Sequence, residues 1–165
     1  MSLEEYMMEA KYCTRCSVCK WMPLDFIKSW RYAQICPSIS KYNFHAYSGG
    51  GRVVAAISLV EKRGEITEEL KEIIYRCQLC GACNVMCHLV TDLVEPLEIA
   101  RELRFRCVDE GKTIPALAAV ADRLKKTGNF FGKPPAERGK WADGLELKDA
   151  TKEKVEVLFY AWCKL

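Results

Sequence analysis

Apolar residues recur every three or four positions through most of the first 127 residues, which is the period of an amphipathic helix. Thr67 is a typical helix-starting residue with acidic residues after it, and Pro96 and Pro115 suit the first turns of two further helices. A glycine follows several of the apolar stretches and ends them. The pattern predicts helices over residues 3–10, 52–62, 67–74, 96–109 and 115–126.

The chain changes character at Gly128. Residues 128–144 hold four glycines, the pair Pro134–Pro135 and three aromatic residues, which predicts an irregular loop. The segment Val155–Tyr160 is rich in β-branched and aromatic residues and predicts one strand, which would need a partner strand from elsewhere. We therefore expect an all-α domain over residues 1–127 and an irregular extension over residues 128–165.

Composition narrows the class of protein. Half of the 165 residues are hydrophobic and 28% are charged, which is typical of a globular chain. A formal net charge of +3 gives little reason to expect nucleic-acid binding. The longest mostly apolar run, Val53–Val60, is much shorter than the about 20 residues of a membrane span, and the first residues carry no targeting signal. We expect a soluble, cytoplasmic protein in a reducing compartment, where clustered cysteines bind metal or do redox chemistry.

The strongest signal lies in the 10 cysteines. One run is Cys77-x2-Cys80-x2-Cys83-x3-Cys87, and an earlier set consists of Cys13-x2-Cys16-x2-Cys19 and the remote Cys36-Pro37. Three closely spaced thiolates can wrap one face of a cubane [4Fe–4S] cluster, and in two-cluster ferredoxins the fourth cysteine of such a run ligates the other cluster. We therefore expect two [4Fe–4S] clusters, the first held by Cys13, Cys16, Cys19 and Cys87 and the second by Cys77, Cys80, Cys83 and Cys36.

Two other kinds of site are weaker hypotheses. Structural zinc sites typically use pairs of CxxC motifs, which fit a repeated CxxCxxC triplet poorly, and a redox disulfide explains still less of the pattern. A zinc-stabilised interaction module without a redox role remains the alternative from a different class. Cys107 and Cys163 are left over, and Cys107 shares a helical stripe with Ile99 and Leu103, which favours a buried, inert thiol.

The two triplets with crossed remote cysteines resemble the α-helical ferredoxin domain, which occurs in the iron–sulfur subunits of succinate dehydrogenase, fumarate reductase and glycolate oxidase. Within that group the chain most resembles heterodisulfide reductase-like iron–sulfur oxidoreductases, over roughly residues 6–110. The residues that carry this resemblance are Cys13–Cys16, Ile35–Ser38, Tyr47–Arg52, Cys77–Cys83 and Pro96–Ile99.

The resemblance implies electron transfer through two [4Fe–4S] clusters, as the relay module or subunit of an anaerobic oxidoreductase. Its implied partners are an electron donor and a cysteine-rich, flavin or quinone-reactive acceptor. If the chain associates with a membrane, we expect it to do so peripherally, through such a partner. A quinone-linked dehydrogenase subunit is the alternative within the class. The segment Val155–Cys163 is similar to the opening strand and first cysteine of a cysteine-rich CCG domain, so we expect a truncated or split protein that lacks the catalytic module.

The chain departs from the family pattern in two places. The stretch Lys20–Ile35 separates Cys19 from Cys36 and carries four aromatic residues; we interpret these as shielding a cluster from water, in preference to docking a partner. His88 follows Cys87 where proline is usual, and we interpret it as a tolerated exposed substitution in preference to a redox-linked proton carrier.

The remaining polar motifs suggest structural roles. We interpret Gly49–Arg52 as a flexible helix start, His45 as structural, and Arg101, Arg104 and Arg106 as a solvated face. The sequence shows no nucleophile–base pair and no paired carboxylates, so it predicts no catalytic site of its own.

Overall fold

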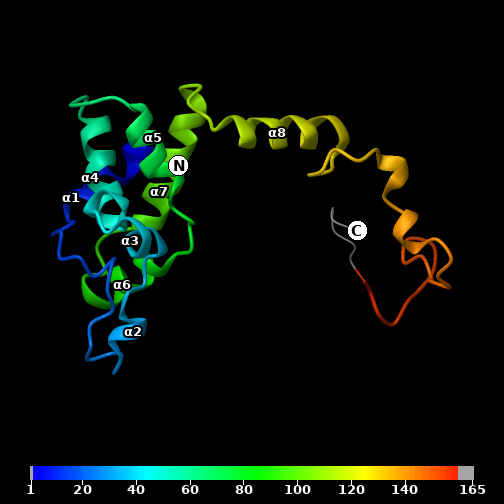
Figure 1. Ribbon diagram of the computed structural model, residues 1–165, viewed down its shortest axis with the longest axis horizontal. Coiled ribbons are helices and arrows are strands. Elements are labelled where there is room, and N and C mark those ends of the chain that lie inside the picture. Colours follow the sequence, from blue (N-terminus) through cyan, green and yellow to red (C-terminus); the bar gives the residue numbers. More distant parts are fainter. Residues whose placement is uncertain (1, 160–165) are drawn as a thin grey trace. The chain divides into compact units, whose positions relative to one another are not determined.

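The computed structural model describes residues 2–159 and is all-α, which confirms the predicted fold class (Figure 1). Its α-helices, in chain order, are α1 (Met7–Lys11), α2 (Trp30–Ala33), α3 (Pro37–Tyr42), α4 (Gly49–Val60), α5 (Glu68–Tyr75), α6 (Ala82–Val90), α7 (Pro96–Asp109) and α8 (Pro115–Thr127). Short 3-10 helices are η1 (Leu3–Tyr6), η2 (His45–Tyr47), η3 (Pro135–Glu137) and η4 (Lys140–Ala142). Within residues 2–159 the only strand-like pairing is an isolated bridge between Trp21 and Gln34.

The chain divides after Lys112 into two compact units. The first unit holds η1 to α7 and every cysteine of the two predicted sets. The sequence analysis placed the helix at 115–126 in the first domain, whereas the contacts group α8 with the C-terminal unit. The cysteine chemistry therefore lies entirely within the first unit.

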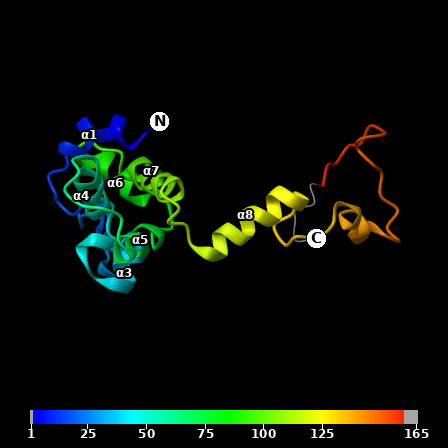
Figure 2. The ribbon, with the colours of Figure 1, turned by 90° about the horizontal axis from the view of Figure 1, so that it is seen from above.

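The core of the first unit lies between α4 and α7, the two longest helices of this unit, which pack against each other (Figures 1 and 2). Val53 of α4, Ile74 of α5, and Ile99 and Leu103 of α7 are all 0% exposed. Cys107 is also 0% exposed on the same face of α7, which confirms the predicted buried thiol. This core fixes the helix ends on which the cysteines stand.

Polar caps set where the central helices begin. The Ser48 hydroxyl accepts the Gly51 backbone N–H at 2.9 Å, and the Thr67 hydroxyl accepts that of Leu70 at 3.2 Å, so each satisfies one orphan donor of a first turn. The start at Thr67 agrees with the sequence prediction. The Ser48 cap places the start of α4 at Gly49, three residues before the predicted start at Arg52.

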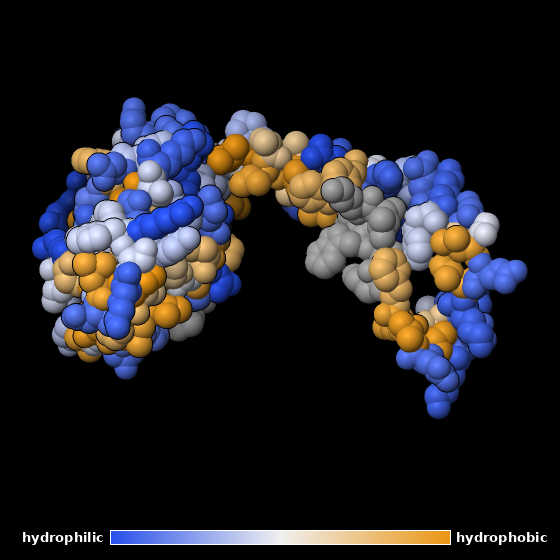
Figure 3. Space-filling view, turned by 60° about the horizontal axis from the view of Figure 1, so that its bottom comes forward, coloured by the Kyte–Doolittle hydropathy of each residue, from blue (hydrophilic) through white to orange (hydrophobic). Residues whose placement is uncertain are grey.

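The second unit has few buried side chains. Asn129 is buried, and its amide oxygen accepts the backbone N–H of Phe131 at 2.8 Å and of Lys133 at 3.4 Å, which holds the turn after α8. The apolar Leu117 and Leu124 of α8 are 47% and 42% exposed, and apolar surface follows this helix in the space-filling view (Figure 3).

The predicted strand at Val155–Tyr160 is wrong over its described part. Residues 155–159 are irregular, and Val157, Leu158 and Phe159 are 84%, 72% and 65% exposed. A strand needs the backbone of a neighbour, and the residues that the structure describes offer none here. Tyr160 lies outside the described residues.

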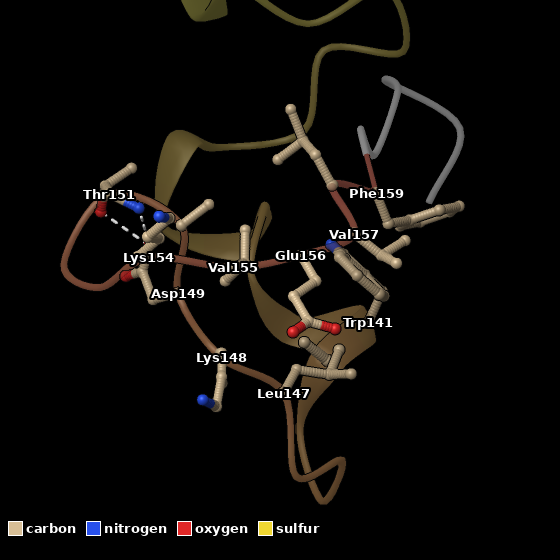
Figure 4. A pocket seen from close by; sticks show the side chains of 13 residues that line it. Trp141, Leu147, Lys148, Asp149, Thr151, Lys154, Val155, Glu156, Val157 and Phe159 are labelled. Carbon is tan, nitrogen blue, oxygen red and sulfur yellow. Dashed lines mark hydrogen bonds between the residues drawn. The ribbon is translucent and has the colours of Figure 1, made fainter.

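The C-terminal segment borders a wide, open hollow (Figure 4). Trp141 and Phe159 meet there edge to face, with ring centroids 5.5 Å apart. No cysteine lines the hollow, so it has no part in the cysteine chemistry. Among residues 2–159, no helix combines the length and the apolar character needed to cross a bilayer.

Candidate metal centres

Eight cysteines of the first unit surround two small cavities, four at each. The first cavity is lined by Cys13, Cys16, Cys19 and Cys87, and the second by Cys36, Cys77, Cys80 and Cys83. The structure thus brings the cysteines together in the two groups that the sequence analysis paired. Cys107 lines neither cavity, and Cys163 lies outside the described residues.

The two CxxCxxC loops fold alike. Arg15 and Ser17, at the second and fourth positions after Cys13, have φ of 59° and 72°. Leu79 and Gly81, at the corresponding positions after Cys77, have φ of 52° and 80°. Left-handed residues are unfavourable unless the surroundings fix them, so the same pair of reversals in both loops turns each triplet toward its own cavity. The repeated CxxCxxC triplet is therefore also a structural repeat.

The remote cysteines reach the cavities from helices. Cys36 is the residue before α3, with Pro37 at the first helical position, and its Sγ lies 3.8 Å from the Tyr47 carbonyl oxygen. Cys87 lies within α6, and its Sγ is 3.3 Å from the Thr91 hydroxyl. The helix α6 also carries Cys83, the last cysteine of the second triplet, which lines the second cavity, whereas Cys87, one turn further along, lines the first.

The start of α4 lies between the two cavities. A Cβ atom on Gly49 would lie 2.8 Å from Cys83 Cβ at the second cavity, and a Cβ atom on Gly50 would lie 3.4 Å from Cys19 Sγ at the first. The Gly50 backbone N–H donates to Cys19 Sγ at 3.2 Å. Since adjacent residues touch different cavities, and consecutive Cα atoms are about 3.8 Å apart, the two sites are immediate neighbours.

This geometry corrects the interpretation of Gly49–Arg52 as a flexible helix start. All four residues are buried, and a Cβ atom on Gly51 would lie 2.2 Å from the His45 carbonyl oxygen. The glycines are present because the helix backbone approaches both cavities and η2 so closely that no side chain fits at Gly49 or Gly51.

Burial changes the acidity of the thiols. It raises the pKa of Cys83 to about 12, with neighbouring Cys77 and Cys19 as further causes. Burial also raises the pKa of Cys87, and the hydrogen bond with Thr91 offsets part of that rise. A buried thiolate needs a compensating positive charge. The thiols of Cys83 and Cys87 are therefore expected to lose their protons only when a metal centre supplies that positive charge.

Three side chains from three helices bind carbonyl groups at the end of α5 and in the residues that follow it, up to Cys77. Arg52 of α4 donates to the Ile73 carbonyl, Arg104 of α7 donates to the Tyr75 and Cys77 carbonyls, and Ser38 of α3 donates to the Arg76 carbonyl. These groups have no partners within the helix, and cations are favourable at a helix C-terminus. The second triplet therefore starts from a fixed point.

Arg104 contradicts the predicted solvated face of α7. Its side chain reaches across to α5 and lies over the Tyr75 ring, with Cζ 5.4 Å from the centroid. Arg101, in contrast, is exposed and pairs with Glu98 at 2.8 Å, as expected for a solvated face. No sequence pattern distinguishes the two, since only the packing of α5 against α7 decides which arginine meets the carbonyl groups.

The two histidines differ in their distance from the sites. His45 lines the first cavity, which the sequence analysis missed, and burial followed by Lys20 and Arg15 lowers its pKa. His88 lines neither cavity. Its ring is exposed, with Nε2 2.8 Å from Glu95 Oε1 and Nδ1 3.5 Å from Asp92 Oδ1.

The aromatic stretch Lys20–Ile35 does not shield a site. Backbone hydrogen bonds join its two ends, Ile35 to Lys20 and Met22 to Ala33, so the aromatic residues lie on an extended loop. Phe26, Trp30 and Tyr32 are 60%, 73% and 63% exposed, and none of the loop residues lines either cavity. These exposed side chains cover neither cavity, contrary to the interpretation of the stretch as a shield.

Residues 9–89 match the family model described as a 4Fe-4S dicluster domain. The match spans all eight cavity cysteines. Searches of curated proteins and of solved structures found no match. The family match and the thiol-lined cavities define an iron–sulfur, ferredoxin-like domain in this part of the chain, and such a domain points to electron transfer.

The residues present fit such a group. Each cavity offers four thiol ligands, and a backbone N–H donates to one sulfur at each, from Gly50 to Cys19 at 3.2 Å and from Leu79 to Cys77 at 3.4 Å. Hydrogen bonds of this kind tune iron–sulfur centres. No group of three or more His, Cys, Asp and Glu side chains within residues 2–159 could hold a single metal ion.

Proposed function

We propose that the chain relays electrons through two [4Fe–4S] clusters, as the iron–sulfur module or subunit of a heterodisulfide reductase-like anaerobic oxidoreductase. The observation that carries this proposal is the division of eight cysteines into two sets of four around neighbouring cavities. A bound [4Fe–4S] cluster supplies a one-electron couple whose potential depends on its surroundings. The chain itself holds, spaces and insulates the two centres.

The short distance between the sites supports a relay. Gly49 lines the second cavity, and the next residue, Gly50, lines the first and donates its N–H to Cys19 Sγ. The buried start of α4 therefore serves as a fixed spacer between them. An electron that reaches one site therefore has the other as its nearest acceptor.

We propose that partners dock where each site reaches the surface. In each triplet the middle cysteine, Cys16 or Cys80, is exposed. The first and third cysteines of both triplets are partly or fully buried. One exposed edge would face an electron donor and the other a cysteine-rich, flavin or quinone-reactive acceptor. A quinone-linked dehydrogenase subunit has the same two edges and remains the alternative within the class.

A zinc-stabilised interaction module is the alternative from a different class. Structural zinc sites bring four ligands to one tetrahedral ion. Pairs of CxxC motifs are typical of such sites, whereas this chain has two CxxCxxC triplets, each with a remote fourth cysteine at its cavity, and this arrangement favours a larger centre.

Metal content tests the proposal. Anaerobic reconstitution of the full chain is expected to give about eight irons and about eight sulfides per chain, because each cubane holds four of each. The protein should be brown, with broad absorption near ~400 nm that is typical of thiolate-bound clusters. Colourless protein that contains zinc and no iron would establish the alternative, and a stable count near four would show that one of the two sites is not a cluster site.

Loss of clusters in air tests the role of the aromatic loop. Trp30→Ala is expected to leave the decay rate of the absorption near ~400 nm unchanged, because Trp30 is 73% exposed and lines neither cavity. His45→Ala is the matched comparison, and its faster decay is expected because His45 lines the first cavity. A Trp30→Ala protein that bleaches as fast as the His45 variant would restore the loop as a shield.

A further inference from the structure

Arg52 is a fully buried cation without a carboxylate partner. Its side chain, on the first turn of α4, is 1% exposed. Nε and Nη2 donate to the Ile73 carbonyl at 3.1 and 2.8 Å, and Nη1 donates to the Tyr47 carbonyl. No aspartate or glutamate among residues 2–159 forms an ion pair with it. A buried charge is costly unless an opposite charge compensates it.

The groups that can become anionic near Arg52 are the thiols of the second site. Arg52 lines the second cavity together with all four of its cysteines. The Tyr47 carbonyl that accepts from Arg52 also accepts from the Cys36 thiol. Burial lowers the pKa of the guanidinium, while Cys77, Cys36 and Cys83 raise it.

The first site has no equivalent cation. Arg15 lines the first cavity, but it is exposed, so water and salt screen its charge. Each site has one described backbone N–H donor to sulfur, Gly50 to Cys19 at the first and Leu79 to Cys77 at the second. The first site also has the Thr91 hydroxyl 3.3 Å from Cys87 Sγ, which is a neutral group and not a charge. The partly buried Arg104 also lies near the second site, where it donates to the Cys77 carbonyl, but of the two arginines only Arg52 is fully buried and lines the cavity.

We propose that Arg52 is the internal counterion of the second site and sets its reduction potential above that of the first. The proposal rests on the function proposed above. An oxidised cubane and its four thiolates together have a net charge of about −2. When the reduced first site passes one electron to the second, the first site is oxidised and the second is reduced, so the negative charge beside Arg52 grows by one. A fixed cation in a low-dielectric interior stabilises the reduced form more than the oxidised form. The transferred electron therefore rests at the site held by Cys36, Cys77, Cys80 and Cys83.

The test is an EPR-monitored redox titration of the reconstituted full chain, with the second midpoint assigned by Cys80→Ser. Arg52→Met removes the charge and keeps an unbranched side chain, and Arg52→Lys keeps the charge. Arg101→Met, which removes an exposed arginine of α7, is the matched control. We expect Arg52→Met to weaken reduction of the second site about tenfold or more, a shift of about 59 mV for one electron, with the first midpoint unchanged and little change in either control.

The outcomes separate a charge effect from a structural one. Equal shifts at both sites, an unmoved second midpoint, or a lysine variant that falls as far as the methionine variant would overturn the proposal. If the Arg52→Met protein binds only the first cluster while the Arg52→Lys protein binds both, the requirement for a positive charge is supported. If both variants lose the second cluster, the role of Arg52 is only to hold the α5 carbonyl groups, and the proposal is overturned. A wild-type chain without iron would overturn the proposed function as well, whereas two clusters with an unmoved second midpoint contradict the Arg52 proposal alone.

Discussion

The double variant Cys36→Ala/Cys80→Ala is expected to keep one intact [4Fe–4S] cluster, whereas Cys36→Ala/Cys16→Ala is expected to compromise both. Cys36 and Cys80 line the same cavity, although they belong to different halves of the sequence. Cys16 lines the other cavity. The first pair of changes therefore removes two ligands from one site, and the second removes one ligand from each.

EPR spectra and iron counts distinguish these results. Each single variant, Cys36→Ala or Cys87→Ala, should give a [3Fe–4S] signal when oxidised, because a site with three thiolates loses its unanchored iron. Cys107→Ala is the control, since Cys107 is 0% exposed in the core and lines neither cavity. If Cys36→Ala/Cys80→Ala loses both clusters while Cys36→Ala/Cys16→Ala keeps one, the ligation is uncrossed and Cys36 and Cys87 exchange sites.

The sequence predicted α4, α5, α7 and α8 because their patterns are local, but it did not predict α2, α3 or α6. Helical periodicity and the cap at Thr67 are encoded within a few residues, and α5 and α7 begin where the sequence indicates. The grouping of the thiols followed from the pattern of two-cluster ferredoxins, in which the fourth cysteine of a run ligates the other cluster. The structure places Cys87 in this way.

The sequence missed the features that depend on distant contacts. Arg52 and Arg104 look like ordinary charged residues of helices, and only the position of the α5 end makes them donors to its carbonyl groups. His45 lines a cavity because η2 packs against the start of α4. The predicted strand also depends on a distant contact. Residues 155–159 have a β-forming composition, but no neighbouring strand pairs with them among the described residues.

Gly51→Ala is expected to have the largest effect on folding of any single substitution considered. A Cβ atom on Gly51 would lie 2.2 Å from the His45 carbonyl oxygen and 2.7 Å from Ala46 Cα. Both are backbone atoms, which cannot rotate away as a flexible side chain can. Either α4 or η2 must move, and these elements line both cavities through Gly49, Gly50 and His45.

The free energy of unfolding, measured by chemical denaturation, is expected to fall by about 3 kcal/mol or more in Gly51→Ala, at the upper end of overpacking costs. Gly64→Ala is the matched control, because a Cβ atom there would lie 3.6 Å from the Ser58 hydroxyl, an ordinary contact.

Gly49→Ala tests the second site separately, since its Cβ would lie 2.8 Å from Cys83 Cβ. Iron uptake should fall toward about half, because one of two four-iron sites is affected. A Gly51→Ala protein as stable as the Gly64 variant, with full iron content, would show that α4 does not pass between the sites as closely as described.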